Sequence, residues 1–511
     1  MINKRDYVLS AFLFSVALLL RLYWVQTTGF NGLYGQDAYA YFDFAIELQQ
    51  ALLEWRLPTA FFWPLGYPSL LATLFSFFGA SAAVGQVINL VLGSMLAVLV
   101  YILTRQLGCQ RFGALVASLV MAVCGQAIQS SIVLMADTPA LFWAMLSAVL
   151  LISYTSASSD STQNHIANNT HDKFLSKLPS VRWLILSALM LTFAGVTRWL
   201  YFSLAPIWTI IVLRHWRWKI RWWDSIRTIG VVLLILLSQL AYNQTTPFPT
   251  FNHAWVVGWS PFNLFQQSFV NADGQFHYTY PNILFYAAPW LNSYYASPVF
   301  IVFVLAGLWA LWRKRDPKLL FLGGWLLVPY LFLSGIPYQN IRFPLIVFPP
   351  VAILVGIGIH WLMGTVARIG LWRWVVFIGC ILLSVFGFSQ TLKTSETIIS
   401  TFIANQQRDK EIATWVNEQL PTDATLYTFG ITLILQHETP FTIYDLYFET
   451  PESLNAKWIE EQTDYVLVNG WVINNQWEGR EPYIAFYWIS DERGLLNIGR
   501  YGNYTLFQVQ N

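Results

Sequence analysis

Four charged residues lie in apolar or aromatic surroundings, where a charge needs a physical reason. The stretches that contain them are GLYGQDAYAYFD with Asp37, LMADTPALFWAM with Asp137, FAGVTRWLYFSLAP with Arg198 and PYQNIRFPLIVFPP with Arg342. A carboxylate can take a proton from an attacking hydroxyl, and a guanidinium can hold a phosphate through paired hydrogen bonds. The two residue types together are therefore suited to chemistry that involves a phosphate.

Each of these residues also has a plainer interpretation, which the sequence leaves open. Asp37 fits a hydrated loop carboxylate, and Asp137 precedes Thr-Pro as a capping residue does at the start of a helix. Arg198 and Arg342 fit arginines that extend toward lipid headgroups or pair with a local acid.

The segment around Asp37 is aromatic and acidic at once. Aromatic rings can form an interfacial belt in a membrane protein or stack against a sugar. Asp43 and Glu47 share one helix face, whereas Asp37 points elsewhere. We include four neighbouring residues as weaker candidates for contacts with the sugar or the acceptor: Tyr39, Asp43, Trp63 and Tyr67.

The composition establishes the setting for these residues. The chain has 511 residues, of which 56% are hydrophobic, 17% aromatic and only 11% charged, and its mean hydropathy is +0.48. These values identify a multispanning membrane protein. Apolar stretches lie near 7–25, 84–104, 112–128, 138–154, 183–197, 199–213, 226–243, 297–312, 319–334, 343–361 and 374–390, with a shorter one at 67–78. This pattern predicts a mainly α-helical bundle with about 11 to 13 spans.

Basic residues cluster in alternate loops and so predict sidedness. Lys4, Arg5, Arg105, Arg111 and the segment RKRDPK at 313–318 fall on one side, which the positive-inside rule assigns to the cytoplasm. The same alternation places the loops of Asp37, Asp137, Arg198 and Arg342 on the outer face.

The pattern changes after Gln390. DKEIATWVNEQL has a helical period, whereas ATLYTFG, DYVLVNG and residues 503–509 resemble short strands. We therefore predict two domains, a transmembrane domain at 1–390 and a small extracytoplasmic α/β domain at 391–511.

Several kinds of chemistry receive no support from the sequence. Cys109, Cys124 and Cys380 lie in or beside apolar runs without metal-ligand spacing, so we expect packing roles. No Walker loop, strand-borne GxGxxG, HExxH or GxSxG occurs, which leaves soluble nucleotide chemistry and nucleic-acid binding unsupported.

The order of the motifs GQDAYAYFDFA, WPLGYPSLLATLFSFFG, MADTPALFW, GVTRWLYFSLAP and IRFPLIVFPPVAIL resembles that of the membrane glycosyltransferases of the GT-C type. The closest resemblance is to family 39, which includes dolichyl-phosphate-mannose protein mannosyltransferases and the aminoarabinose transferase of lipid A. Three features depart from the family pattern: its acidic pair is here Gln36-Asp37, a basic residue that is often lysine is Arg198, and the proline-rich turn after the first-loop helix reads WPLGYP.

This resemblance implies an inverting transfer from a polyprenyl-phosphate sugar to a lipid, glycan or protein acceptor. It implies Asp37 as the general base, Asp137 as a second acid, and Arg198 and Arg342 as ligands of the lipid phosphate. It requires no cofactor and leaves a divalent cation open. The expected location is the cytoplasmic membrane of a bacterium, with the N-terminus cytoplasmic. The alternatives are a transporter or flippase of lipid-linked sugars and a protein whose outer domain docks a partner.

Overall fold

The computed structural model describes residues 3–167, 178–214, 222–245, 257–366, 372–460 and 465–510. As predicted, the chain is mainly helical. The longer helices are α1 (Lys4–Thr28), α2 (Gly35–Leu53), α3 (Gly66–Phe78), α4 (Ala82–Gln106), α5 (Arg111–Val123), α6 (Gly125–Ile132), α7 (Asp137–Ala167), α8 (Leu178–Thr197), α9 (Ala205–Arg214), α10 (Trp222–Gln244), α14 (Ile301–Arg313), α15 (Lys318–Ser334), α16 (Phe348–Val366) and α17 (Trp372–Gln419).

Shorter elements connect these helices. They are the 3-10 turns η1 (Trp199–Leu204), η2 (Pro261–Phe265), η3 (Pro298–Phe300) and η4 (Phe343–Val347), the single turns α12 (Asn282–Phe285) and α13 (Ala288–Leu291), and the hairpin of β1 (Ser268–Asn271) and β2 (Gly274–His277).

Six helices of the described residues are long and apolar enough to cross a membrane, or seven spans if α5 and α6 count as one. These two helices meet at Cys124 with a bend of 54°. The predicted span at 199–213 is instead a 3-10 turn followed by α9, and the stretch near 67–78 is the short helix α3. The membrane domain therefore combines full spans with shorter apolar helices at 66–78, 181–197, 199–214, 298–313 and 318–334.

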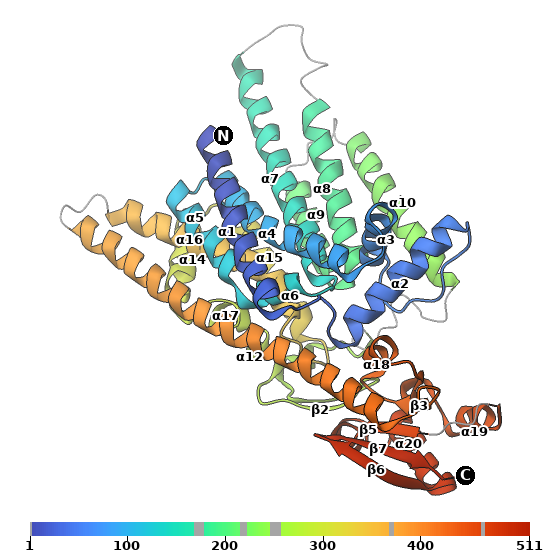
Figure 1. Cartoon of the computed structure of the whole chain (residues 1–511). Coiled ribbons are helices and arrows are strands. Elements are labelled where there is room, and N and C mark those ends of the chain that lie inside the picture. Colours follow the sequence, from blue (N-terminus) through green and yellow to red (C-terminus); the bar gives the residue numbers. More distant parts are fainter. Residues whose placement is uncertain are drawn as a thin grey trace.

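The two ends of the helical bundle differ in character (Figure 1). One end carries the N-terminus and the basic residues that precede α5 and α15, and we call it the basic end. There Asp6 of α1 is fully buried, accepts hydrogen bonds from Tyr101 and Arg111 at 2.8 and 3.0 Å, and lies 3.3 Å from Arg105. This network ties α1, α4 and α5 together.

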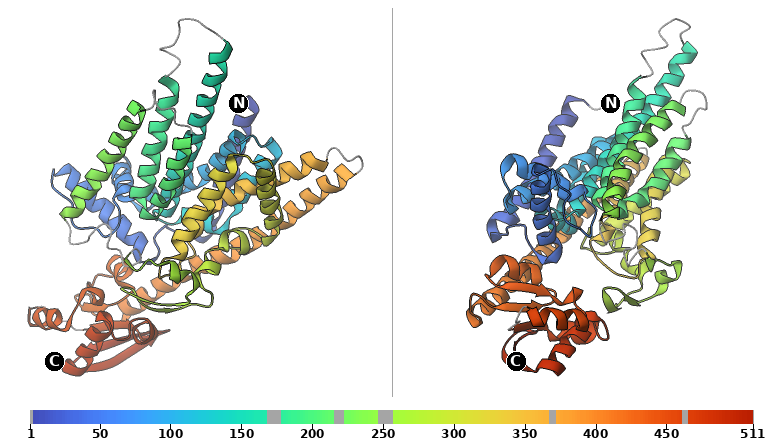
Figure 2. Two further views of the ribbon diagram at one scale, coloured as in Figure 1. Left: turned by 180° about the vertical axis from the view of Figure 1, so that it is seen from behind. Right: turned by 90° about the vertical axis from the view of Figure 1, so that its right-hand side faces the viewer.

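The opposite end, which we call the sheet end, faces the C-terminal sheet (Figures 1 and 2). Beyond α17 the chain forms β3 (Thr425–Thr428), α18 (Thr432–Glu438), β4 (Thr442–Asp445), η5 (Leu446–Phe448), α19 (Pro451–Glu460), β5 (Tyr465–Asn469), the π-helical turn η6 (Val472–Gln476), α20 (Glu481–Arg493), β6 (Leu495–Tyr501) and β7 (Tyr504–Val509). The strand order is β4-β3-β5-β7-β6, with β3 parallel to β4 and β5 and with β7 antiparallel to β5 and β6.

Helix α17 joins the two parts without a break. It spans 48 residues and continues through residue 390, where the sequence changes from apolar to polar. In Figure 1 it runs beneath the bundle and ends at the sheet. The predicted boundary at 390 therefore falls inside one continuous helix, while the predicted strands correspond to β3, β5 and β7.

Candidate active site

The four charged residues singled out in the sequence meet at the sheet end of the bundle. Arg342 donates from Nη2 to Oδ2 of Asp37 at 3.1 Å, and its Nη1 lies 3.9 Å from Oδ2 of Asp137. Nη1 of Arg198 lies 2.9 Å from Oδ1 of Asp137. Two carboxylates and two guanidiniums thus form one chain of ion pairs, which we call the acid–arginine cluster.

Helix termini favour the two carboxylates of this cluster. Asp37 lies in the first turn of α2, and Asp137 is the first residue of α7. The N-terminus of a helix carries a partial positive charge and stabilises anions. The capping interpretation of Asp137 is therefore compatible with a place in the cluster.

The charge of Arg342 is secured by its neighbours. Burial lowers the pKa of Arg342, but the charges of Asp37 and Asp137 outweigh that effect and leave the pKa raised. Its Nη1 also contacts Sδ of Met135, and its Nε donates weakly to Asn340. Arg198 lies 5.1 Å from the ring centre of Phe343, in cation–π range.

The two carboxylates differ in access. The Asp37 side chain is 32% exposed, whereas that of Asp137 is 3% exposed. Among the described residues, Oδ2 of buried Asp137 accepts no hydrogen bond. Asp37 is thus the carboxylate that a substrate can reach, whereas Asp137 is enclosed and lies beside the two arginines.

Aromatic rings of the first loop form a wall beside the cluster. The Tyr41 ring lies 5.3 Å from the Trp63 ring and 5.2 Å from the Tyr67 ring. Burial raises the pKa of the Tyr41 hydroxyl, which also feels the charges of all four cluster residues, so it stays protonated at neutral pH. Trp63 and Tyr67 reach the site through Tyr41, a residue that sequence reasoning did not select.

A close approach of two helices places Arg198 next to this wall. A Cβ on Gly66, the first residue of α3, would lie 2.7 Å from Oγ1 of Thr197 and from the carbonyl oxygen of Val196. Only a glycine at this position allows the start of α3 to pack against the last residues of α8, which directly precede Arg198.

Two buried amides of α4 lock the loops of the two aspartates together. Nε2 of Gln86 donates to the carbonyls of Phe30 and Ile132, both at 3.0 Å. Nδ2 of Asn89 donates to the carbonyls at positions 133 and 135, at 2.7 and 3.1 Å. The segment before Asp137 is thereby fixed against the segment before Asp37.

Arg21 supports the same segment from inside the membrane. Its side chain is fully buried in α1, with Nε donating to Ser131 at 2.8 Å and Nη1 to the carbonyl of Ala17 at 2.9 Å. Ser131 is in the last turn of α6, where a cation interacts favourably with the helix dipole. In the sequence, this contact is indicated only by the presence of one arginine, Arg21, inside the first apolar run. We did not predict a role for it.

The turn that carries Arg342 is held by the long loop before α14. Asn282 donates from Nδ2 to the carbonyls of residues 334 and 336, at 3.1 and 2.6 Å. Tyr286 and Tyr295 donate to the carbonyls of residues 338 and 341, at 2.7 and 2.6 Å. These bonds fix the backbone on both sides of Gln339 and leave Arg342 aimed at the aspartates.

Tyr39 and Asp43 point away from the cluster, toward the C-terminal sheet. The Tyr39 ring lies 4.9 Å from the ring of His437 in α18, and Nε2 of His437 lies 2.7 Å from Oδ1 of Asp43. Gln36 accepts a hydrogen bond from the backbone N–H of Leu433 at 3.0 Å. The structure therefore separates the predicted sugar contacts: Trp63 and Tyr67 lie beside the site, and Tyr39 and Asp43 face α18.

A second contact holds the C-terminal part at the sheet end. Nε2 of Gln476 donates to the carbonyl of Asp273 in the β1–β2 hairpin at 2.9 Å. A Cβ on Gly274, whose φ is +118°, would lie 2.5 Å from the Gln476 carbonyl. The C-terminal part is thus held by α2 on one side and by the hairpin on the other.

The donor set of the cluster does not resemble a metal site. Within the described residues, no group of three or more His, Cys, Asp or Glu side chains is placed to hold a metal ion. Asp37 and Asp137 are each paired with an arginine, so a cation bound here would have to displace a guanidinium.

Comparison with known proteins places this geometry in a family context. Residues 74–257, which include Asp137 and Arg198, match the family model described as dolichyl-phosphate-mannose-protein mannosyltransferase. No curated protein sequence matches the chain.

Solved structures match over nearly the whole chain. ArnT from Cupriavidus metallidurans in the apo state has a TM-score of 0.59 and 11% identity, with 98% of this chain and 97% of ArnT covered. ArnT bound to undecaprenyl phosphate gives a TM-score of 0.58 at 11% identity, covering 99% and 98%. The oligosaccharyltransferase of Archaeoglobus fulgidus gives 0.55 at 10% identity, covering 91% of this chain and 69% of that protein.

At these identities the structural likeness concerns the fold, which is the GT-C fold that the motif order predicts. The family model adds sequence similarity over residues 74–257. The chain therefore shares the fold of these GT-C membrane glycosyltransferases, and its residues 74–257 are similar to the mannosyltransferase family model.

Proposed function

We propose that this protein is an inverting glycosyltransferase that moves a sugar from a polyprenyl-phosphate donor to a lipid, glycan or protein acceptor on the outer face of the membrane, with Asp37 as general base. The observation that carries the proposal is the acid–arginine cluster, in which one accessible carboxylate lies beside two guanidiniums.

The proposed reaction uses each part of the cluster. The acceptor oxygen attacks the anomeric carbon while its proton passes to Asp37, and the bond from that carbon to the phosphate oxygen breaks. The electron pair of the broken bond remains on the lipid phosphate, whose added charge Arg342 and Arg198 stabilise. Asp137 holds both arginines in position.

The carrier lipid follows from the location of the site. The cluster lies at the end of the bundle opposite the basic end, and the positive-inside rule assigns the basic end to the cytoplasm. Nucleotide sugars do not reach the outer face, so a donor there must arrive on a lipid. The solved structure of ArnT with undecaprenyl phosphate, and that of the archaeal oligosaccharyltransferase AglB with a dolichol-phosphate and an inhibitory peptide, are consistent with such donors. We place the protein in a bacterial cytoplasmic membrane.

The test is transfer of radiolabelled hexoses and pentoses from polyprenyl phosphate to total membrane glycolipid and protein. Membranes with the wild-type chain, Asp37→Asn and the matched control Glu54→Gln are compared in a strain that lacks the gene. Glu54 is 61% exposed at the other end of α2 and pairs only with Arg56 among the described residues.

Label should appear with wild type and Glu54→Gln and fall by about 10²-fold or more with Asp37→Asn, the usual contribution of a general base. The labelled fraction then identifies the acceptor class. Equal transfer by wild type and Asp37→Asn would contradict the role of Asp37, and transfer from none of the donors would contradict the proposed donor class.

A further inference from the structure

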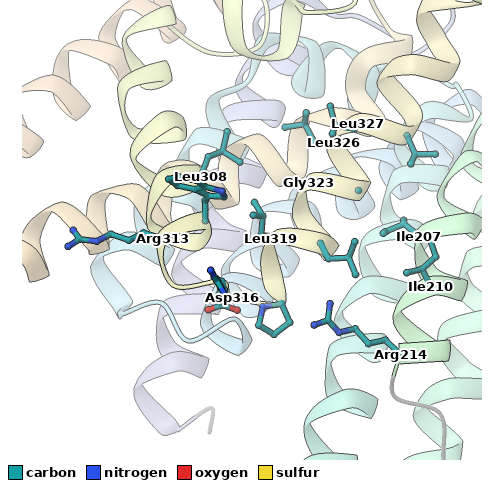
Figure 3. A pocket seen from close by; sticks show the side chains of 16 residues that line it. Ile207, Ile210, Arg214, Leu308, Arg313, Asp316, Leu319, Gly323, Leu326 and Leu327 are labelled. Carbon is teal, nitrogen blue, oxygen red and sulfur yellow. The ribbon is translucent and has the colours of Figure 1, made fainter.

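Two pockets of this protein differ in place and lining. The larger groove lies between α9, α14 and α15, is lined mainly by aliphatic side chains, and reaches the α14–α15 connection at the basic end (Figure 3). A smaller pocket, of about 180 Å³, lies in the C-terminal part beside the β1–β2 hairpin. We call it the aromatic pocket; its lining residues are Ala272, Tyr447, Trp477, Arg480, Glu481 and Pro482. None of them belongs to the acid–arginine cluster.

The connections of the C-terminal sheet change sides next to the aromatic pocket. Strands β4, β3 and β5 are parallel and adjacent, with the first of them in sequence, β3, in the middle. Leu426 and Leu467 share a hydrophobic cluster with α18, whereas Tyr427 and Val466 share another with α20. Since neighbouring residues of a strand point to opposite faces of a sheet, α18 and α20 cover opposite faces. The chain therefore leaves β3 toward one face and β5 toward the other.

Sheets of this topology bind ligands in the crevice outside the carboxyl ends of their parallel strands, where the connections diverge. The segments that follow these ends build the aromatic pocket. Phe429 and Tyr447 come directly after β3 and β4, and Trp477 comes after β5 and η6. Open space remains here, because a Cβ on Gly430 or Gly470 would meet no atom within 4 Å. The topology thus favours a ligand site at the same place as the pocket.

Three aromatic rings at the pocket hold one another in place. The rings of Phe429 and Tyr447 are parallel, with an angle of 4° between them. The Trp477 ring lies across both, 5.0 Å from Phe429 and 5.5 Å from Tyr447, in T-shaped geometry. Trp477 is 5% exposed, whereas Tyr447 is 37% exposed. Tyr447 therefore offers an apolar ring, already oriented, against which a sugar ring can stack.

Arg480 and Glu481 add hydrogen-bonding groups to the pocket. They are the N-cap and the first residue of α20. Within the described residues, neither side chain takes part in an ion pair or a hydrogen bond. The guanidinium only donates and the carboxylate only accepts, whereas a sugar hydroxyl can do both. The pair is therefore suited to bind neighbouring hydroxyl groups.

The charges around the pocket favour a neutral ligand over an anion. Burial raises the pKa of Tyr447, and the nearby charge of Asp273 in the hairpin adds to this rise. An anion beside Arg480 would therefore also meet the carboxylates of Asp273 and Glu481. A ligand rich in hydroxyl groups avoids this repulsion.

The β1–β2 hairpin connects the aromatic pocket with the turn that carries Arg342. Ala272 at the tip of the hairpin lines the pocket. Its neighbour Asn271 donates from Nδ2 to the carbonyl of Pro337 at 2.9 Å. Figure 1 shows the hairpin between the bundle and the sheet. A ligand in the pocket therefore lies at the sheet end, beside an element that packs against the turn of Arg342.

We propose that the aromatic pocket binds one sugar unit of a glycan acceptor, with its ring against Tyr447 and its hydroxyl groups bound by Arg480 and Glu481. Pockets for whole drug-sized ligands begin at about 300 Å³, so this smaller volume suits a single sugar ring. The inference rests on the proposed function, because it narrows the acceptor to a polysaccharide or the sugar part of a glycolipid. The pocket holds one unit of the acceptor while another unit reaches Asp37.

The test measures oligosaccharide binding to the purified full chain by saturation-transfer difference NMR. The probes are neutral oligosaccharides released by mild acid from the glycolipids and polysaccharides of the strain that lacks the gene, which carries the unmodified acceptor. Wild type should bind at least one of them. Tyr447→Leu should weaken this binding by about tenfold, as truncation of an aromatic anchor does, whereas Tyr447→Phe keeps the ring and most of the binding. The control Tyr487→Leu, at a tyrosine of α20 that is 36% exposed and outside the pocket, should leave binding unchanged.

A second pair of variants tests the polar groups without changing the net charge. Arg480→Gln/Glu481→Gln should weaken binding by about tenfold or more, because hydrogen bonds to charged groups are stronger than those between neutral groups. The control Glu492→Gln/Arg493→Gln makes the same change at the other end of α20 and should bind like wild type.

Three results would overturn the proposal: no probe binds to wild type, the pocket variants bind like wild type, or only anionic oligosaccharides bind and Glu481→Gln strengthens their binding. The binding assay needs neither donor nor transfer. Binding by a wild-type chain that transfers no sugar would therefore reject the proposed reaction and keep the pocket. Transfer of label to protein alone, without oligosaccharide binding, would reject the pocket and keep the reaction.

Discussion

Asp37 and Arg342 are 305 positions apart in the sequence, and their side chains meet at 3.1 Å. The first comes from the helix after the first span, the second from a turn near the end of the membrane domain. A contact between the two ends of the membrane domain closes the site, so the arrangement depends on the fold of the whole bundle. The contact also supplies Arg342 with an anionic partner within the protein.

Arg342→Lys should impair the enzyme although it keeps the charge. Lysine presents a point charge, whereas the planar guanidinium contacts Asp37 and Asp137 and, in the proposed reaction, also the lipid phosphate. We expect the KM for the polyprenyl-phosphate sugar to rise about tenfold and kcat to fall by about tenfold or more. Steady-state transfer assays check this, with Arg56→Lys as the matched control because Arg56 also pairs with carboxylates on α2 and near its end. Unchanged kinetics for Arg342→Lys would argue against contact with the phosphate.

Asp137→Ala should destabilise the protein more than the double variant Asp137→Ala/Arg198→Leu. Removing one partner of a buried ion pair leaves an uncompensated charge and costs about 3–5 kcal/mol, while removing both relieves most of that cost. The Asp137 side chain is 3% exposed and that of Arg198 is 17% exposed, so the pair is shielded from water. Thermal unfolding in detergent should give the lowest Tm for the single variant. A double variant with a Tm as low as that of Asp137→Ala would mean that the two residues do not act as a pair.

Gly66→Ala should reduce activity through the position of Arg198. The new methyl group would lie 2.7 Å from the Val196 carbonyl and from Thr197, so α3 or the end of α8 must shift. Overpacking of this kind typically costs about 1–3 kcal/mol. A cysteine introduced next to the site reports on this shift, because it should be labelled at a different rate in Gly66→Ala than in the wild-type background. Its labelling rate should be unchanged in Gly364→Ala, where the added methyl group meets open space. Equal activity of both variants with wild type would show that α3 does not position Arg198.

Docking of α18 onto α2 should weaken as the pH rises. The hydrogen bond to Asp43 raises the pKa of His437, and burial opposes that shift. The contribution of the pair is fully present below the ordinary histidine pKa of about 6.5 and is lost as the pH rises through the raised value. Because both side chains are 30–40% exposed, the effect should be small, at most about 1 kcal/mol.

Hydrogen–deuterium exchange of Thr432–Glu438, corrected for intrinsic rates, measures this docking. Exchange should increase by up to about fivefold between pH 5.5 and 8.5 in the wild type and stay constant in His437→Gln. If exchange of this segment in the wild type does not change with pH, the Asp43–His437 pair does not contribute to the docking of α18 onto α2.

The class of fold could be predicted from the sequence because it depends on features that can be recognised along the chain. Apolar runs, basic loops and the order of short motifs predicted a helical GT-C bundle, and both the helical content and the fold comparison support that prediction. The lengths of individual spans were harder, because a bend at Cys124 and the 3-10 turn at Trp199–Leu204 depend on packing against neighbours.

Site residues could be predicted from the sequence where a charge lies in apolar surroundings. They could not be predicted where an uncharged polar residue holds the backbone in place. Asp37, Asp137, Arg198 and Arg342 were visible as charges in apolar surroundings, and the structure brings them together. Gln86 and Asn89 carry no such signal, since amides in an apolar helix can satisfy many partners. Asp43 contacts His437, 394 positions away, a pairing that no local pattern in the sequence predicts.

The unbroken helix α17 sets mechanical limits on this enzyme. Its 48 residues amount to about 72 Å of rigid rod, anchored in the membrane at one end and in the sheet at the other. Since α17 has no break, the sheet cannot swing away from the bundle by bending at this connection. Any separation of the sheet from the bundle would require release of its contacts with α2 or with the hairpin.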